Sequence, residues 1–297
     1  MSDKRVEMKT ALGIGGPIIQ VTTARGGRKY ELPSVPGSPS VPSVTSIIGG
    51  TLKSWQLENW KLKWIRDGLE SYLDTELSYD TIDAILSASG NEARASAAIG
   101  SQMHDIIDGL LQGNQEIVVS DQLEPAVRGF LRWRQAHANW EYIDSEVAVF
   151  TQDFAGTVDA LFREPVNKRY MVVDWKTSSG IYDSAMMQVA AYCYALDDML
   201  MRSEETIKVI ATPNIGPLPT PQAVFDLKTG QPVEGMVVRF DNNYPLDGDG
   251  KKVRTLPKIF TDRVQIAKVD RAKWWQAFHA CHSLHDGVKG SIRKEWI

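Results

Sequence analysis

The stretch AGTVDALFREPVNKRYMVVDWK, residues 155–176, decides how we interpret the rest of the chain. Apolar and polar residues alternate over 155–163 and again over 169–176, which predicts two strands. Residues 165–168 fit a short turn, so the two strands should pair as an antiparallel hairpin. The same alternation over 142–150 predicts a third strand before them, joined by a turn at 152–153.

Two acids and one amine stand out on this hairpin. Asp174 and Lys176 share one face of their strand, and hairpin pairing can set Asp159 beside Asp174. Neighbouring carboxylates repel each other, and a divalent cation removes that conflict. Oxygen ligands suit Mg²⁺ or Mn²⁺ better than zinc. Glu146, on the preceding strand, could add a third acid. An ion pair between Asp174 and Lys176, with no cation, is the structural alternative.

Lys176 gains a chemical role if a cation binds beside it. Its ammonium could orient an attacking water and offset negative charge that develops on a phosphate. The hairpin therefore favours metal-dependent hydrolysis of a phosphate ester.

Helical spacing surrounds these strands. We expect helices over 54–69, 80–86, 91–112, 121–140, 183–200 and 270–285, and one more strand over 206–211. The order helix, three strands, helix, strand predicts an α/β fold of mixed α+β type, in which an antiparallel meander is joined by a parallel strand. We divide the chain into an arm of extended pieces and loops that is not a packed unit (1–42), a helical region (43–119), a core (120–211), and a strand and loop insertion with a basic helix (212–297).

Polar side chains on two predicted helices could complete the site. Gln188 and Tyr192 share a helix face with Ser184 and could contact a nucleic-acid strand. They could equally be the polar rim of an amphipathic helix. His104 lies beside Ile107 and Leu111 on its helix, where a histidine is more often structural than functional.

Composition excludes several classes of protein. Hydrophobic residues make up 43% and charged residues 24%, as in a folded globular protein. Neither a membrane-spanning run nor a secretion or mitochondrial signal is visible, so we expect a cytoplasmic protein of a bacterium or a phage-infected cell. Cys193 and Cys281 cannot build an iron–sulfur cluster of four cysteines.

Charge is distributed unevenly along the chain. Residues 251–297 carry a net charge of +7, whereas the rest carries −11. This basic segment could contact DNA phosphates without reading the sequence. The candidate contacts are Lys251, Lys252, Arg254, Arg263 and Lys273. Four tryptophans could stack on unpaired bases, although such residues more often belong to a core. These are Trp55, Trp60, Trp274 and Trp275.

The motifs together resemble the RecB-like branch of the PD-(D/E)XK nucleases. The resemblance covers about residues 42–211 and rests on GSQMH (100–104), GTVD (156–159), VVDWKTS (172–178) and QVAAY (188–192). PSVTS (42–46), followed by Trp60, makes the chain similar to the exonucleases related to the mitochondrial genome maintenance exonuclease and to their phage and bacterial counterparts. The family implies a restriction-endonuclease-like αβββαβ core and metal-dependent cleavage of DNA.

The resemblance implies a role for each matching residue. Asp159, Asp174, His104 and the backbone carbonyl of Trp175 would hold Mg²⁺ or Mn²⁺, and Lys176 would be the catalytic lysine. Glu146 matches a strand acid of the catalytic site. Thr177, Ser178, Gln188 and Tyr192 would contact or organise DNA.

Several functional alternatives stay open. We expect a DNA exonuclease that acts in DNA repair or recombination. A structure-specific endonuclease or resolvase could use the same site. A DNA-binding module that has lost catalysis is the third possibility, against which the intact Asp159, Asp174 and Lys176 argue. Strand polarity, single- or double-strand preference, RNA cleavage and protein partners stay open.

Overall fold

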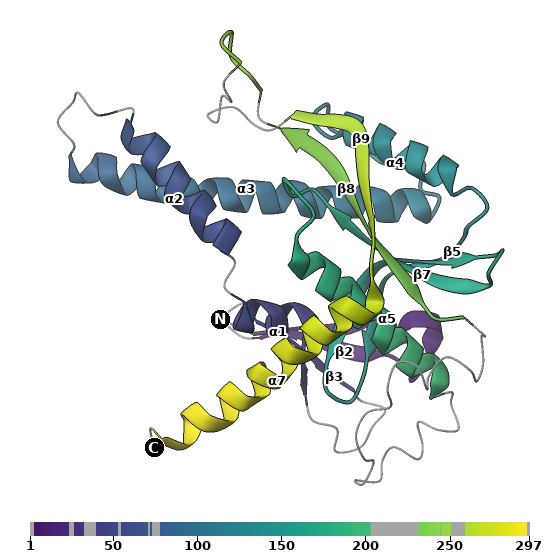
Figure 1. Cartoon of the computed structure of the whole chain (residues 1–297). Coiled ribbons are helices and arrows are strands. Elements are labelled where there is room, and N and C mark those ends of the chain that lie inside the picture. Colours follow the sequence, from purple (N-terminus) through teal and green to yellow (C-terminus); the bar gives the residue numbers. More distant parts are fainter. Residues whose placement is uncertain are drawn as a thin grey trace.

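The computed structural model describes residues 3–23, 27–32, 40–52, 55–70, 72, 78–202, 231–243, 245–250 and 259–295. Within these ranges the strands form two sheets, which Figure 1 shows with the helices around them. The larger sheet has the order β5-β6-β7-β8-β9. Its strands are β5 (Glu141–Phe150), β6 (Ala155–Glu164), β7 (Arg169–Lys176), β8 (Glu234–Asn243) and β9 (Ile259–Lys268).

The larger sheet has the mixed pairing that the sequence predicts. Strands β5, β6 and β7 form an antiparallel meander. Strand β8 lies parallel to β7, and β9 returns antiparallel to β8. With the helix α5 (Asp183–Met201) between β7 and β8, this order confirms the αβββαβ core.

The strand beside β7 is not the one we expected. The segment 206–211 lies outside the described residues, and the place parallel to β7 is taken by β8, inside the range we interpreted as an insertion. Residues 235–240 of β8 are buried on both faces, as a central strand flanked by two others requires. The parallel strand that we expected at 206–211 is therefore supplied by β8, in which Met236, Val237, Val238 and Phe240 are buried.

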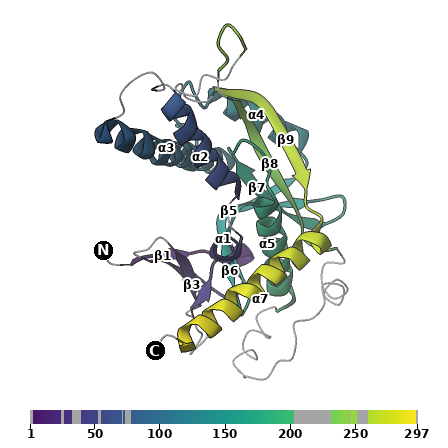
Figure 2. The same ribbon diagram turned by 60° about the vertical axis from the view of Figure 1, so that its left-hand side comes forward.

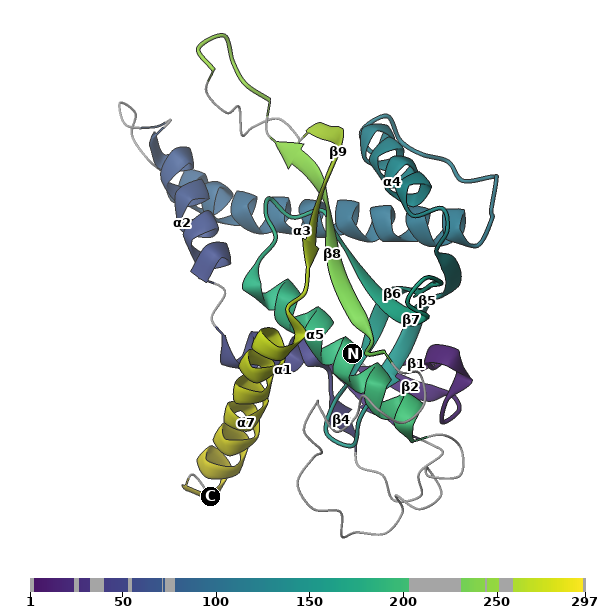
Figure 3. The same ribbon diagram turned by 45° about the vertical axis from the view of Figure 1, so that its right-hand side comes forward.

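Helices cover both faces of the larger sheet (Figure 3). Helices α3 (Tyr79–Leu111) and α4 (Glu124–Ala136) bury Met103 and Phe130 against Phe162 and Val173 of the sheet. On the other face α5 buries its central residues with α1 (Val44–Thr51) and α7 (Arg271–Glu295). Helix α2 (Trp55–Glu70) contacts α3.

Helix α3 is a single helix where the sequence predicts two. The Ser78 hydroxyl oxygen caps it by accepting a hydrogen bond of 3.1 Å from the Thr81 backbone N–H. A glycine inside a helix costs only about 1 kcal/mol, so Gly90 need not end it. Burial of Met103 and Ile107 on the sheet holds the second half of the helix in place. Helix α7 likewise continues beyond residue 285, where we expected it to end.

The N-terminal segment is packed, contrary to our expectation of loose extended pieces. Strands β1 (Lys4–Met8), β2 (Ile18–Thr22), β3 (Arg28–Glu31) and β4 (Val41–Pro42) form the smaller, antiparallel sheet, with a 3-10 turn η1 (Ala11–Gly13) between β1 and β2. Ile18 and Tyr30 are buried against Ala148 and Ala155 of the larger sheet. Gly13, Gly15 and Gly16, which have positive φ, lie in the connection between β1 and β2.

No helix in the described ranges has the length and apolar character that a membrane span requires.

Candidate active site

The strand register brings three acids into one row. The pairing of β6 with β7 includes Ala160 opposite Val173, and one further step places Asp159 opposite Asp174. The pairs Ser145–Ala160 and Val147–Val158 leave Asp159 as the residue opposite Glu146. Three neighbouring strands therefore each present one carboxylic acid at the same level of the sheet.

A possible metal-binding group lies at this row. Ligand atoms of His104, Glu146 and Asp159 all lie within 4.8 Å of one another. His104 reaches the row from α3, and its Nδ1 lies 3.6 Å from Asp159 Oδ2. One imidazole nitrogen with carboxylate oxygens is a donor set that a divalent cation accepts. The residues thus fit a divalent cation.

A backbone contact orients His104. Its Nε2 lies 2.9 Å from the carbonyl oxygen of Trp175. Because a carbonyl oxygen can only accept, Nε2 carries the proton and donates this bond. Neutral His104 consequently keeps the lone pair of Nδ1, the nitrogen that faces Asp159, for a ligand. The Trp175 carbonyl, which the resemblance assigns to the metal, makes this hydrogen bond here.

Asp159 is fixed by the edge of β7. Its Oδ2 accepts a hydrogen bond of 2.8 Å from the backbone N–H of Trp175. This bond continues the contact between β6 and β7 just beyond their last pair, so the acid holds the two strands together where the site is built.

Asp174 and Lys176 form a close ion pair beside the group. The Lys176 Nζ lies 2.7 Å from Asp174 Oδ1 and 2.6 Å from Oδ2. The Asp174 side chain is only 1% exposed. Burial raises its pKa, against the lowering effect of Lys176, while the carboxylates of Asp174 and Asp159 keep the pKa of Lys176 above its usual value despite burial. Asp174 is therefore next to the His104 group without belonging to it.

Glu146 has an unusual backbone and an unusual acidity. Its φ of 49° lies in the left-handed region, which non-glycine residues rarely adopt and which is often found at functional sites. Desolvation, followed by the negative charges of Asp159, Asp108 and Asp105, raises the pKa of Glu146 to about 7, although Arg28 acts in the opposite direction. A bound cation would reverse this rise.

The sequence reasoning missed three of these neighbours. Asp108 lies one helical turn after His104, so the helical period could have indicated it, whereas Asp105 is the next residue and the period gives no signal for it. Asp108 also accepts a hydrogen bond from the Ser145 hydroxyl, which ties α3 to β5. Arg28 belongs to the smaller sheet, and no local pattern connects it to the site.

Helix α5 supplies the two polar residues that its spacing indicates. Gln188 Nε2 donates a hydrogen bond of 2.9 Å to the Tyr192 hydroxyl. Tyr192 is buried, and burial raises its pKa well above the usual value. Its ring lies against Gly156, where an added Cβ would meet ring atom Cε1 at 2.2 Å. Gly156, three residues before Asp159, is thus required because the Tyr192 ring approaches its backbone closely.

Strand β8 fixes the loop that follows Lys176. The side-chain amide of Asn242 donates to the carbonyl of Thr177, and Arg239 Nε donates to that of Ser178 at 2.7 Å. Ser178 Oγ also donates to the Gly180 carbonyl at 2.7 Å.

The structure describes only some of the remaining candidates for DNA contacts. Lys251, Lys252 and Arg254 lie outside the described residues, as do the side chains of Trp55 and Trp60. Lys273 Nζ lies 4.5 Å from the ring centroid of Trp274 on α7. Trp275 stacks on Tyr194 with the ring centroids 3.7 Å apart, and this contact makes it part of the fold. Arg263 is exposed on β9, 3.6 Å from Asp241.

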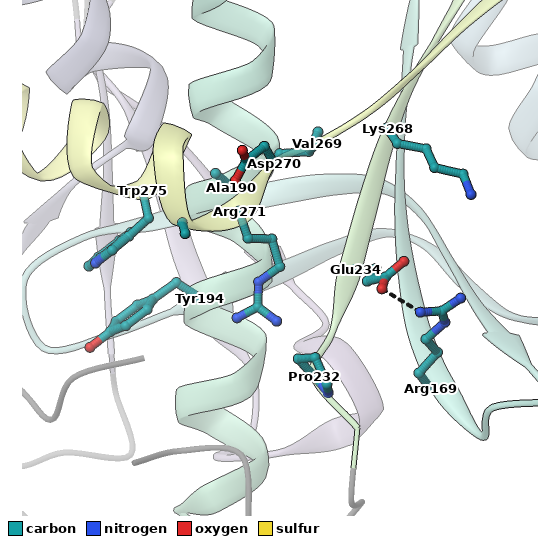
Figure 4. Close-up of a pocket in the computed structure, with 11 residues that line it drawn as sticks. Arg169, Ala190, Tyr194, Pro232, Glu234, Lys268, Val269, Asp270, Arg271 and Trp275 are labelled. Atoms are coloured by element: carbon teal, nitrogen blue, oxygen red, sulfur yellow. Dashed lines mark hydrogen bonds and ion pairs between the residues drawn. The ribbon is translucent and has the colours of Figure 1, made fainter. Parts of the chain in front are cut away.

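A pocket lies at the opposite end of β7, where that strand begins (Figure 4). Its volume is about 710 Å³, and Arg169 and Arg271 face it beside the stacked Tyr194 and Trp275. Arg169 binds Glu234, and Arg271 binds Asp197. Because its arginines are neutralised by carboxylates, this pocket lacks the excess charge that marks the acid row.

The chain is similar to a known family of nucleases. The family model of the PD-(D/E)XK nuclease superfamily matches residues 69–274, a range that includes His104, the acid row, Lys176 and α5. A search of curated proteins finds no match to the chain.

Proposed function

The chain belongs to the PD-(D/E)XK nuclease superfamily, and from this we propose that it is a Mg²⁺- or Mn²⁺-dependent DNA exonuclease of the RecB-like branch, which hydrolyses phosphodiester bonds from DNA ends. The observation that carries the proposal is the meeting of His104, Glu146 and Asp159 within 4.8 Å, beside the Asp174–Lys176 pair. The QVAAY motif on α5 and the similarity of PSVTS to the exonuclease branch favour action at ends.

The metal-binding group of His104, Glu146 and Asp159 would hold the cation. His104 Nδ1 and the carboxylates of Glu146 and Asp159 would be ligands, and Asp174 would add negative charge next to them. A divalent cation at such a site supplies Lewis-acid stabilisation of the phosphate and lowers the pKa of water. The chain's own contribution is to hold these ligands with the hydrogen bonds of the Trp175 backbone.

Lys176 acts as a cation rather than as a base. Its pKa is raised by Asp174 and Asp159 despite burial, so it stays protonated at neutral pH. An ammonium has three donors and no acceptor, so it cannot take a proton from water. It can donate to a phosphoryl oxygen and stabilise the negative charge that grows there during attack. Asp174 holds the ammonium in position for this.

A cleavage assay on three substrates tests the proposal. Linear duplex, linear single-stranded and covalently closed circular DNA are incubated with the full chain and Mg²⁺ or Mn²⁺, with EDTA as the control. We expect linear DNA to be degraded and closed circles to be spared. Cleavage of closed circles would favour the endonuclease or resolvase, and DNA binding without cleavage would favour the DNA-binding module. Cleavage unaffected by EDTA would contradict the metal role.

The biological setting is part of the same proposal. The resemblance to bacterial and phage exonucleases supports a role in DNA repair or recombination in the cytoplasm of a bacterium or a phage-infected cell. The division of the chain into the four regions given above also stays a prediction.

A further inference from the structure

The smaller sheet has two faces, and the register assigns each side chain to one of them. Tyr30 lies opposite Gln20, and its hydroxyl contacts Thr157 Oγ1 at 2.9 Å. The face of Tyr30 therefore packs on β6, one same-face step from Asp159. The neighbouring residue Lys29 points to the opposite face.

A row of polar residues continues the Tyr30 face. Lys4 pairs with Thr22, and Thr22 pairs with Arg28, so these three side chains stand side by side across β1, β2 and β3. Arg28 is two residues from Tyr30, which places it on the same face. Lys4 and Arg28 are exposed, and neither makes an ion pair within the described part of the chain.

The position of Arg28 is fixed by its backbone. Its carbonyl accepts hydrogen bonds from the Ser43 N–H at 3.2 Å and from the Ser46 hydroxyl at 3.3 Å. Ser43 is the residue that caps α1. The turn before α1 therefore holds the base of the Arg28 side chain, while its guanidinium stays available for a ligand.

This row lies near the acids. The positive charge of Arg28 lowers the pKa of Glu146, although desolvation and the surrounding acids raise that pKa more. Figure 2 shows the smaller sheet and the pair α2–α3 projecting on the same side of the molecule, below and above the region where α1 meets β5 and β6. A chain of phosphates that enters the acid row from this side would pass the smaller sheet.

We propose that the row Lys4–Thr22–Arg28 binds a phosphate of the DNA substrate and so aligns the strand with the metal-binding group. This inference rests on the proposed nuclease function and extends its contact surface to the N-terminal sheet. A guanidinium with a hydroxyl and a second cation is a set of donors that suits a phosphate, and an acid-rich site needs nearby cations to accept a polyanion. Arg28 is a positioning residue in this scheme.

Lys29 provides a matched control for Arg28. It is exposed, lies on the same strand and carries the same charge, but it points away from β6. Single-turnover cleavage of end-labelled DNA is measured for the wild type, Arg28→Ala, Arg28→Lys and Lys29→Ala as the enzyme concentration is varied. We expect Arg28→Ala to raise the half-saturating enzyme concentration about tenfold with little change in the maximal rate, and to reduce the salt slope by about 1. Lys29→Ala should stay within about twofold of the wild type, and Arg28→Lys should restore part of the loss.

Two further arms complete the experiment. Thermal denaturation should give equal melting temperatures for Arg28→Ala and Lys29→Ala, since both side chains are exposed. DNA with and without a terminal phosphate shows which phosphate the row binds. If Arg28→Ala weakens binding only of DNA that has the terminal phosphate, the row binds the DNA end. If it weakens binding of both substrates, the row binds the internal backbone. Equal saturation curves and salt slopes for Arg28→Ala and Lys29→Ala, with an active wild type, would overturn the inference. An inactive wild type would instead contradict the proposed function.

Discussion

Strand β7 carries charged residues at both ends, and the two ends neutralise them differently. At its beginning, Arg169 lies between Glu164, at 3.3 Å, and Glu234. Close by, Asp197 binds Arg271, and Asp198 binds Arg202 at 2.7 Å. At this end each buried acid has a basic partner, as a stable fold requires.

The other end of β7 has an excess of acids. Lys176 pairs with Asp174, but Glu146 and Asp159 face each other with His104 as their neighbour, and Asp105 and Asp108 add further negative charge. Such a cluster costs folding free energy unless a cation binds. Buried charge alone therefore does not mark the site, whereas uncompensated charge of one sign does.

The same substitution at both ends gives the largest expected contrast in activity. Asp159→Asn should reduce the cleavage rate about 1,000-fold or more, because it removes a charged ligand of the cation. Asp174→Asn and Lys176→Ala should also abolish cleavage, with DNA binding largely retained. Single-turnover cleavage and fluorescence anisotropy measure the two effects. Activity at the wild-type level in Asp159→Asn or Asp174→Asn would refute the site.

Asp197→Asn should show the opposite behaviour. It leaves the half-buried Arg271 without its carboxylate and should reduce the free energy of unfolding by about 3 kcal/mol, while activity at low temperature is retained. Urea denaturation of this variant and of Asp159→Asn provides the comparison. If Asp159→Asn lost more stability than Asp197→Asn, the acid row would be the end of β7 that stabilises the fold, and the comparison would fail.

Two glycines sharpen the contrast at equal cost in stability. Gly156 packs on Tyr192 near the acids, and a Cβ at Gly235, on β8, would lie 2.3 Å from Val189 Cγ1. Alanine at either position overpacks the contact with α5 and should cost about 2 kcal/mol. Only Gly156→Ala should also slow cleavage, because it displaces Tyr192 and its Gln188 partner. Equal rates for the two variants, measured well below their melting temperatures, would remove Tyr192 from the site.

The hairpin of residues 155–176 shows how much of this could be predicted. Alternation and turn residues indicate β6 and β7 correctly, and the two-residue spacing of Asp174 and Lys176 places them together. These features depend on local periodicity, which a sequence displays directly. The superfamily and the mixed fold follow from the same short motifs.

The features that sequence reasoning missed depend on long-range contacts. The identity of the strand parallel to β7 depends on which distant segment packs beside it, and β8 takes that place. The charge of Arg28 influences Glu146, and the strand that carries Arg28 is held on β6 by the contact of Tyr30 with Thr157, more than a hundred residues later in the chain. The left-handed φ of Glu146 is also invisible, since glutamate gives no signal of it.

The smallest expected effect compares two glutamates as a function of pH. Glu146 has a pKa of about 7 in the folded chain against 4.5 otherwise, so its protonated form contributes stability below about pH 4.5 that is lost as the pH rises to about 7. Glu164 behaves oppositely. Burial alone would raise its pKa, but hydrogen bonds from Asn167 and Val166 and the charge of Arg169 outweigh burial and lower it. The ionised Glu164 therefore contributes stability above about pH 4.5, and this stability is lost in acid. In EDTA at pH 8, Glu146→Gln should therefore stabilise the fold. The gain should be only about 1 kcal/mol, because solvent screens the exposed carboxylate. Glu164→Gln should destabilise the fold at the same pH. Urea denaturation at pH 5 and pH 8 measures both, and shifts of the same sign at pH 8 would show that the two ends of the sheet do not differ in how they neutralise their acids.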